Sequence, residues 1–270
     1  MDQAEAPQQV TCAARLEIVA LPGFPIVSPG DNLAAFIAQS LTLANIRPEP
    51  SDVFVVTSKV VSRAEGRFVD LNTVIASDRA REIAAQVGKD ARVVELILRE
   101  STAVSRITKG AIVVRHKLGF VCANAGLDMS NAKPKTAADN SGPWVLLLPE
   151  APDQTAASLR GELEKQTGVH IGIVISDSFS RPFRLGTVGA AIGISGLPAL
   201  WDRRGEPDLF GRTLEQTVTA LGDQIAAAAD LVAGQANEGR AVVLVRGLRF
   251  AAHGGSAEQL QRPSSEDVYA

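Results

Sequence analysis

The stretch Asp52-Val-Phe-Val-Val-Thr-Ser58 is a short apolar run bounded by polar residues. This pattern is typical of a buried strand. Further segments with strand character follow it or precede it along the chain, at 15–20, 111–116, 144–148, 171–176 and 241–245. Segments with helical spacing lie between them, at 32–44, 78–87, 91–100, 154–166 and 213–233. Because strands and helices alternate, we expect a mixed α/β (α+β) fold.

Polar residues and glycines predict where these helices begin and end. Asp31 is a suitable N-cap for the helix 32–44, and Ser77 and Asp90 can cap the next two. Gly168 should end the helix 154–166. Residues 186–200 are rich in glycine and small apolar residues, and we expect an irregular connection there rather than the regular pattern of a doubly wound domain.

Length and composition indicate an ordinary soluble globular protein. The chain has 270 residues, 46% of them hydrophobic and 21% charged. We expect a flexible tail over 1–13, one catalytic unit over 14–252 that is either single or built from two closely packed lobes, and a polar C-terminal tail over 253–270.

The same numbers exclude several classes of function. A net charge of -3 offers no basic excess for binding nucleic acid. No apolar run reaches the ~20 residues of a membrane helix, and the N-terminus lacks the pattern of a signal peptide. The two cysteines make a disulfide framework improbable, so we expect a cytoplasmic protein.

Two segments carry a concentration of oxygen donors. Gly119-Phe-Val-Cys-Ala-Asn-Ala-Gly-Leu-Asp-Met-Ser-Asn131 places Asp128 on what looks like a loop after a strand. Ile175-Ser-Asp-Ser-Phe-Ser-Arg-Pro-Phe-Arg184 looks like a second acidic loop, with Asp177 at the carboxyl end of a strand. Two such carboxylates can hold divalent ions that bridge phosphate oxygens. The alternative, equally open, is that both aspartates only cap turns or helices.

Basic residues suggest an anionic ligand. Arg181 and Arg184 belong to an arginine-rich segment that continues to Arg212, although a solvated surface of ion pairs explains this density as well. There is neither a P-loop nor a Gly-x-Gly-x-x-Gly fingerprint, so a P-loop enzyme and a Rossmann dinucleotide binder are not supported. His116 and Cys122 are expected to pack rather than to react.

Six ordered motifs resemble the coenzyme F-420-0:L-glutamate ligase (gamma-glutamyl ligase) family of deazaflavin coenzyme biosynthesis. Besides the two segments above, they are Val-Val-Thr-Ser-Lys-Val-Val-Ser-Arg-Ala-Glu-Gly-Arg (55–67), Ala-Ala-Ile-Gly-Ile-Ser-Gly-Leu-Pro-Ala-Leu (190–200), Asp-Leu-Phe-Gly-Arg (208–212) and Val-Arg-Gly-Leu (245–248). The resemblance runs from about residue 16 to 268. It implies a homodimer with an unusual two-lobed fold of mixed sheets and flanking helices.

The resemblance also implies a GTP-dependent reaction. Such enzymes join L-glutamate to a carboxylate of the F-420 precursor through an acyl phosphate, release GDP and phosphate, and often add further γ-linked glutamates. They use Mg²⁺ or Mn²⁺, expected as two ions, together with K⁺. A related ligase with another acid acceptor, a non-catalytic protein that binds GTP or deazaflavin, and a metal-dependent phosphohydrolase remain alternatives.

By resemblance, several positions acquire roles. Asp128, Asp177 and Ser178 correspond to metal ligands. Apart from the resemblance, Arg181 and Arg184 join Asp128 and Asp177 in the predicted catalytic set, because arginines of the 181–212 segment could hold the phosphodiester of the precursor or the carboxylates of glutamate. The nucleotide contacts would be Phe24, Pro25, Ile26, Val27, Ser58, Lys59, Arg63, Asn131, Gly234 and Gln235. Lys59 and Arg63 depart from the residues common in the family, which puts their phosphate contacts in question. Neither departure removes a carboxylate.

Overall fold

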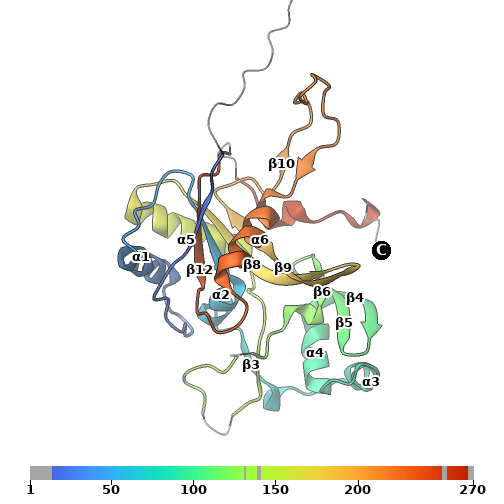
Figure 1. The fold of residues 1–270 in the computed structure, drawn as a ribbon. Coiled ribbons are helices and arrows are strands. Elements are labelled where there is room, and N and C mark those ends of the chain that lie inside the picture. Colours follow the sequence, from blue (N-terminus) through green and yellow to red (C-terminus); the bar gives the residue numbers. More distant parts are fainter. Residues whose placement is uncertain (1–13, 131, 139–140, 251–253, 267–270) are drawn as a thin grey trace, which may run out of the picture.

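A mixed five-stranded sheet forms the centre of the protein, whose computed structural model describes residues 14–130, 132–138, 141–250 and 254–266 (Figure 1). The strands lie in the order β1 (Glu17–Ala20), β12 (Val242–Arg246), β2 (Val53–Thr57), β8 (Gly172–Arg181) and β9 (Arg184–Ser195). Only β2 and β8 are parallel neighbours; the other pairs are antiparallel. The predicted mixed α/β class is confirmed.

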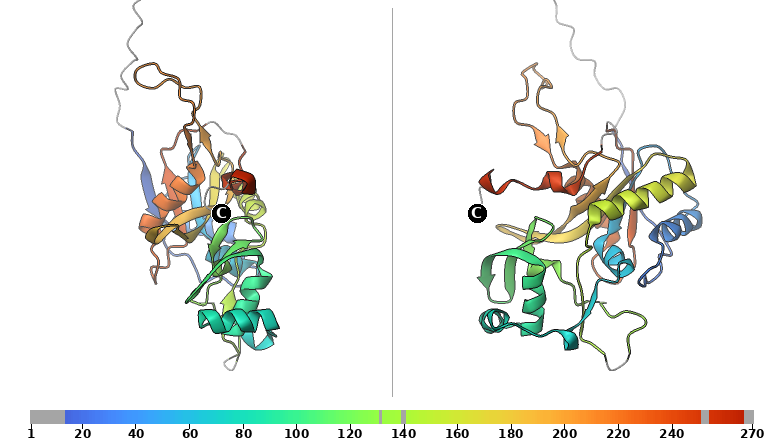
Figure 2. Two further views of the ribbon diagram at one scale, coloured as in Figure 1. Left: turned by 90° about the vertical axis from the view of Figure 1, so that its right-hand side faces the viewer. Right: turned by 180° about the vertical axis from the view of Figure 1, so that it is seen from behind.

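The sheet is covered on both faces, as the alternation along β2 shows. Phe54 and Val56 pack in a core that includes residues of α1 (Leu33–Leu43), α2 (Ser58–Ala64) and α5 (Pro152–Thr167). Val53 and Val55 pack on the opposite face, against α6 (Leu221–Ala233). Figure 2 shows α5 and α6 on opposite sides of the sheet. Burial on both faces explains why β2 is continuously apolar.

A second lobe has its own hydrophobic core. It contains the helices α3 (Asp78–Val87) and α4 (Ala91–Arg99), a sheet of β4 (Ser101–Thr108), β5 (Ala111–His116) and β6 (Val121–Ala123), and the pair β3 (Phe68–Asp70) and β7 (Trp144–Leu146). Arg67 contacts both this lobe and the segment before α5. Its Nη2 lies 2.8 Å from a carboxylate oxygen of Glu100, and its Nε donates to the Leu148 carbonyl. The two-lobed arrangement follows from these separate cores.

The predicted helix caps are confirmed with one exception. The side chains of Ser77 and Asp90 accept backbone N–H groups at the starts of α3 and α4, and Gly168 ends α5 in the left-handed region. The prediction for α1 was wrong by one residue. Asn32 caps this helix by accepting the N–H of Ala35, whereas Asp31 accepts the N–H of Ser28 and closes the preceding turn.

The predicted loops around Asp177 are in fact one long hairpin. β8 continues to Arg181 and pairs with β9, so Asp177 lies within a strand opposite Ala190. The glycines of β9 have a packing role: a Cβ on Gly189 would lie 2.5 Å from the Ala226 carbonyl of α6, and one on Gly193 would lie 2.6 Å from the Pro152 backbone of α5. Close approach of a neighbouring backbone is a common reason for glycine inside a strand.

The helix predicted over 213–233 begins only at Leu221. The residues before it return along a protruding hairpin, whose base is formed by β10 (Trp201–Asp202) and β11 (Val218–Thr219). Backbone hydrogen bonds join Gly205 to Leu214 in this hairpin. The apolar spacing of Leu214 and Val218 matched a helix only by coincidence.

The C-terminal segment differs from the predicted polar tail in its described part, 254–266. Two short 3₁₀ turns form there, η3 (Ala257–Leu260) and η4 (Ser264–Glu266). Ala257 is buried, and its N–H donates to Asp153 over 2.8 Å. Gln261 donates to the Leu118 carbonyl of the second lobe. The segment therefore bridges the main sheet and the second lobe.

Candidate functional site

Asp128 lies in the connection from η2 (Asn124–Gly126) to the segment before β7, next to a lysine. Reciprocal backbone hydrogen bonds with Leu146 fix its main chain. Lys59 Nζ lies 2.6 Å from Oδ2, and the Ser130 hydroxyl and N–H both donate to Oδ1. Burial alone would raise the pKa of Asp128, but the hydrogen bonds from Lys59 and Ser130 outweigh it and hold the pKa below its ordinary value.

Asp177 has a different environment on β8. The Ser58 hydroxyl, at the start of α2, donates to Asp177 Oδ1 over 2.8 Å. Burial raises the pKa of Asp177 to about 6, the nearby charge of Asp128 acts in the same direction, and the hydrogen bonds from Ser58 and the Ser178 N–H oppose it. Asp128 and Asp177, the acidic pair, are therefore close enough to influence each other across the two lobes.

The donors of the acidic pair fit a hard divalent cation. Among the described residues no group of three or more His, Cys, Asp and Glu side chains could hold a metal ion, so the chain itself provides two carboxylates and neighbouring hydroxyls. Mg²⁺ is commonly bound by one or two carboxylates together with water and substrate phosphates. Burial raises the pKa of Asp177, and a bound cation would offset this cost of ionising the carboxyl group.

The described residues that were predicted to bind a nucleotide lie at three places, of which the end of α6 is the third. Ser58 and Lys59 contact the acidic pair directly. Arg63 is buried, donates to the Val27 carbonyl over 2.8 Å and stacks on Phe68. Its guanidinium therefore supports the loop of Phe24, Pro25, Ile26 and Val27, in which Ile26 is exposed. Their contacts with a nucleotide stay a prediction.

The end of α6 reaches the other side of β8. The Ser178 hydroxyl donates to Gln235 Oε1 over 3.0 Å, directly after Gly234. Because adjacent strand residues face opposite ways, Ser178 and Asp177 point to different faces of β8. Asn131 lies outside the described residues.

The predicted substrate arginines are not beside the acidic pair. Arg181 and Arg184 are opposite each other in the strand register at the tip of the β8–β9 hairpin. The Arg181 guanidinium donates to the Leu185 carbonyl. Arg181 follows Asp177 by four positions, which is about 13 Å along β8. In the second hairpin, Arg203 and Arg204 form ion pairs with Glu206 and Asp202, as the surface interpretation expected. A role for Arg181 and Arg184 stays a prediction.

His116 and Cys122 pack, as predicted. His116 is buried and stacks on Phe120, and burial lowers its pKa to about 4, so it is neutral at pH 7. Burial and the charge of Asp177 raise the pKa of Cys122 to about 12. Burial therefore favours the neutral form of both side chains near neutral pH.

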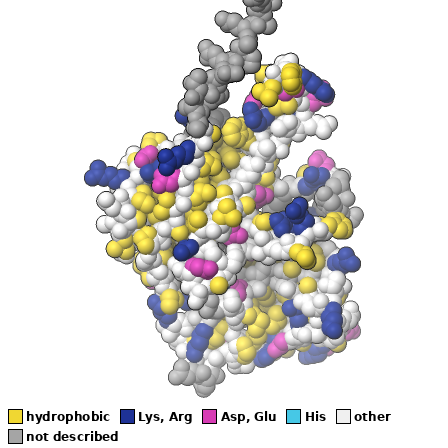
Figure 3. All heavy atoms as spheres, viewed as in Figure 1, with side chains coloured by type: hydrophobic (Ala, Val, Ile, Leu, Met, Phe, Trp, Pro, Cys, Tyr) yellow, Lys and Arg dark blue, Asp and Glu magenta, His cyan; other side chains and the backbone are white. Residues whose placement is uncertain are grey.

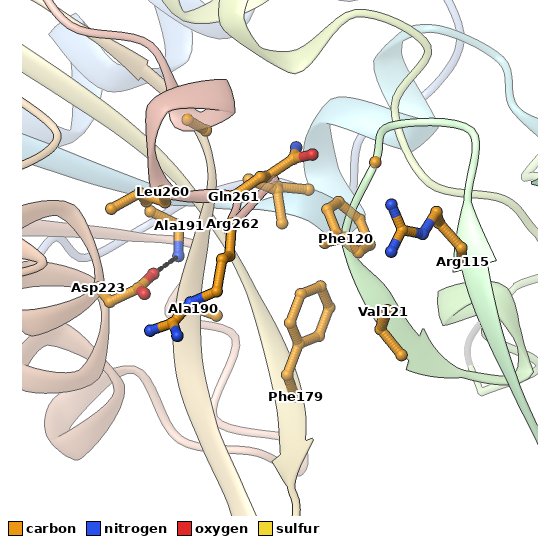
Figure 4. Close-up of a pocket in the computed structure, with 13 residues that line it drawn as sticks. Arg115, Phe120, Val121, Phe179, Ala190, Ala191, Asp223, Leu260, Gln261 and Arg262 are labelled. Atoms are coloured by element: carbon orange, nitrogen blue, oxygen red, sulfur yellow. Dashed lines mark hydrogen bonds between the residues drawn. The ribbon is translucent and has the colours of Figure 1, made fainter. Parts of the chain in front are cut away.

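The sequence interpretation missed a cavity lined by the β8–β9 hairpin, the β5–β6 connection, α6 and the C-terminal segment (Figure 4). Arg115, Asp223 and Arg262 contribute to its walls from three separate parts of the chain. Nothing in the sequence signals this meeting, because Arg115 lies in an ordinary strand, Asp223 in a helix and Arg262 in an expected tail.

Comparison with known proteins now identifies the class: the chain is a ligase that forms carbon–nitrogen bonds. The model of the family described as F420-0:Gamma-glutamyl ligase matches residues 23–247, and the chain belongs to this family. It is 47% identical over 223 residues to the coenzyme F420:L-glutamate ligase of Methanopyrus kandleri. The aligned region covers 83% of this chain and 83% of the relative. It is 41% identical over 257 residues to that of Methanocaldococcus jannaschii, covering 94% of this chain and 97% of the relative.

No helix within the described residues has the length and apolar character needed to cross a membrane.

Proposed function

We propose that this protein joins L-glutamate to a carboxylate of the coenzyme F-420 precursor, with GTP as the energy source. The observation that supports it most directly is the acidic pair with Lys59 and Ser58, in a chain that shares its family with enzymes named coenzyme F420:L-glutamate ligase. Mg²⁺ or Mn²⁺ at the acidic pair, and K⁺ as in the family resemblance, belong to the same proposal.

The chemistry requires an activated carboxylate. An oxygen of the acceptor carboxylate attacks the γ-phosphorus of GTP, GDP leaves, and an acyl phosphate forms. The glutamate amine, having lost its extra proton, then attacks the acyl carbon and inorganic phosphate leaves with the C–O bonding pair. A divalent ion at Asp128 and Asp177 would neutralise phosphate charge. Lys59 can hold a phosphate oxygen once its contact with Asp128 is released.

The experiment is product analysis of the purified protein with GTP, L-glutamate, Mn²⁺ and the F-420 precursor. We expect a mass gain of whole glutamyl units together with glutamate-dependent release of GDP, and neither with Asp128→Asn. The number of units added is read from the same spectrum. Asp78→Asn, an exposed carboxylate on α3, is the matched control.

Other outcomes of this experiment point to the alternatives. Phosphate release without glutamate or precursor would mean a phosphohydrolase. Nucleotide binding without any product would mean a non-catalytic binder. Glutamate-dependent GDP release only with a different acid would identify another acceptor.

A homodimer is the remaining part of the proposal. Phe183 and Leu185 at the tip of the β8–β9 hairpin are 99% and 98% exposed, and Leu209 and Phe210 at the tip of the second hairpin are 87% and 96% exposed. Hydrophobic atoms gather on the tip of that second hairpin (Figure 3). Such exposure is typical of association surfaces. We expect light scattering to give a dimer mass, reduced to that of a monomer by Phe210→Asp but not by Ile75→Asp.

A further inference from the structure

A cavity of about 290 Å³ lies where the β8–β9 hairpin, the β5–β6 connection and the C-terminal segment meet (Figure 4). Its surface is largely apolar, with contributions from Phe120, Val121, Phe179, Ile192 and Leu260. The volume is just below the roughly 300–1,000 Å³ typical of ligand pockets. A cavity of this size suits a small molecule better than a nucleotide or a complete deazaflavin.

Three ionisable groups border the cavity. Arg115 enters from β5, Arg262 from the C-terminal segment and Asp223 from the first turn of α6. In Figure 4, Arg115 lies on one side of the Phe120–Phe179 pair, and Arg262 and Asp223 lie on the other. The three groups together carry two positive charges and one negative charge.

Asp223 already has one structural contact. The β8–β9 ladder shifts register between the pairs Ile175–Gly193 and Ser176–Ala191. The Ala191 N–H donates to Asp223 Oδ1 over 2.9 Å at this irregularity. The second carboxylate oxygen is left for a ligand, and an asparagine at this position keeps an acceptor for Ala191.

The cavity adjoins the acidic pair. Phe179 follows Asp177 by two residues on β8, so both side chains leave the same face of the strand about 7 Å apart. On the opposite wall, Val121 precedes Cys122, whose thiol lies near the Asp177 carboxylate. A ligand in the cavity therefore lies next to the place where phosphates would bind.

We propose that this cavity is the L-glutamate site, where Arg115 and Arg262 bind the two carboxylates and Asp223 binds the ammonium group. This inference rests on the proposed function. L-Glutamate carries two negative charges and one positive charge, the reverse of the three groups in the cavity. The apolar walls suit its two methylene groups.

The first experiment measures steady-state kinetics with GTP and precursor held at saturation and L-glutamate varied. We expect Arg115→Gln and Arg262→Gln each to raise the KM for L-glutamate by about 10- to 100-fold, the usual effect of losing a charge-assisted hydrogen bond. The KM for GTP should not change. Arg106→Gln, at an exposed position on β4 of the sheet that holds Arg115, is the control and should behave as the wild type.

The second experiment tests Asp223 by binding, which needs no turnover. Titration calorimetry with GDP and Mg²⁺ present compares L-glutamate with glutarate, which has both carboxylates but no ammonium group. The wild type should bind L-glutamate more tightly than glutarate. In Asp223→Asn, the ratio of the two affinities should fall by about 10-fold or more, while the melting temperature stays unchanged.

The outcomes separate the two proposals. If the wild type is active and the KM for L-glutamate is unchanged in Arg115→Gln and Arg262→Gln, the glutamate site is overturned and the proposed function stands. A rise in the KM for the precursor instead also overturns it. A wild type without ligase activity overturns the proposed function, and the calorimetric preference then decides the cavity independently.

Discussion

The two carboxylates of the acidic pair come from regions with opposite electrostatic properties. Asp128 lies on an irregular connection in the second lobe, beside Lys59, and its pKa lies below the ordinary value. Asp177 lies within a strand of the main sheet, with a hydroxyl as its side-chain partner, and burial raises its pKa to about 6. The same residue type thus holds its proton less tightly than usual at one position and more tightly at the other, because a sheet interior and a lysine-bearing loop solvate charge differently.

The two carboxylates should contribute about equally to catalysis, because the proposed reaction needs both. Under the proposed function, Asp128→Asn and Asp177→Asn should each reduce kcat/KM by about 10³-fold, since each removes several kcal/mol of charge stabilisation. Glutamate-dependent GDP release measures this. A variant that keeps more than about a tenth of the activity would show that its carboxylate is not part of the machinery.

The two variants should change the free energy of unfolding in opposite directions. Asp177 carries a cost in the folded protein when it ionises, so Asp177→Asn should raise the free energy of unfolding at pH 7 by up to about 3 kcal/mol. Asp128→Asn should lower it by about 0.5–1 kcal/mol, because a partly exposed ion pair is lost. Urea denaturation without metal measures both, and equal signs would contradict the assigned environments.

The pH dependence follows from the same difference. Asp177 has a folded pKa of about 6, above its unfolded value, so the folded state holds this proton more tightly. Its contribution to stability is complete below about pH 4, falls as the pH rises towards 6, and is constant above. We expect the wild-type minus Asp177→Asn difference in unfolding free energy to change by up to about 3 kcal/mol across this window. A flat difference would mean that Asp177 is solvated normally.

A divalent ion should reduce the contrast between the carboxylates. Mg²⁺ or Mn²⁺ at about 100 times its Kd should stabilise the wild type by about 2.7 kcal/mol, since it binds only the folded state. The gain should be absent in Asp177→Asn, which lacks a ligand. Calcium at the same concentration is an informative comparison in the thermal shift assay, because its larger radius calls for more ligands than this pair provides.

The sequence analysis singled out these two carboxylates, and their functional role stays a prediction, but their environments could not be predicted. Both aspartates follow apolar strand patterns, and that much is local information. The pKa of Asp177 is raised by burial, which is a property of the folded chain. The sequence also did not reveal the β8–β9 hairpin, because the glycines of β9 serve the packing of α5 and α6. Lys59 meets Asp128 across 69 positions of chain only because the lobes fold together. The cavity depends still more on long-range contact, since Gln261 brings the C-terminal segment to Leu118.

The smallest expected effect concerns Lys59, which sets Asp128 apart from Asp177. The Lys59 and Asp128 side chains are 35% and 32% exposed, so Lys59→Met should lower the unfolding free energy by about 0.5–1 kcal/mol at most. Without the lysine, the pKa of Asp128 should rise towards that of Asp177, because burial then acts with less opposition. Carbon-detected NMR titration of the carboxyl groups measures this, and Lys117→Met, which removes an exposed lysine near Glu100, is the matched control. An unchanged Asp128 titration would mean that Ser130, rather than Lys59, determines the contrast.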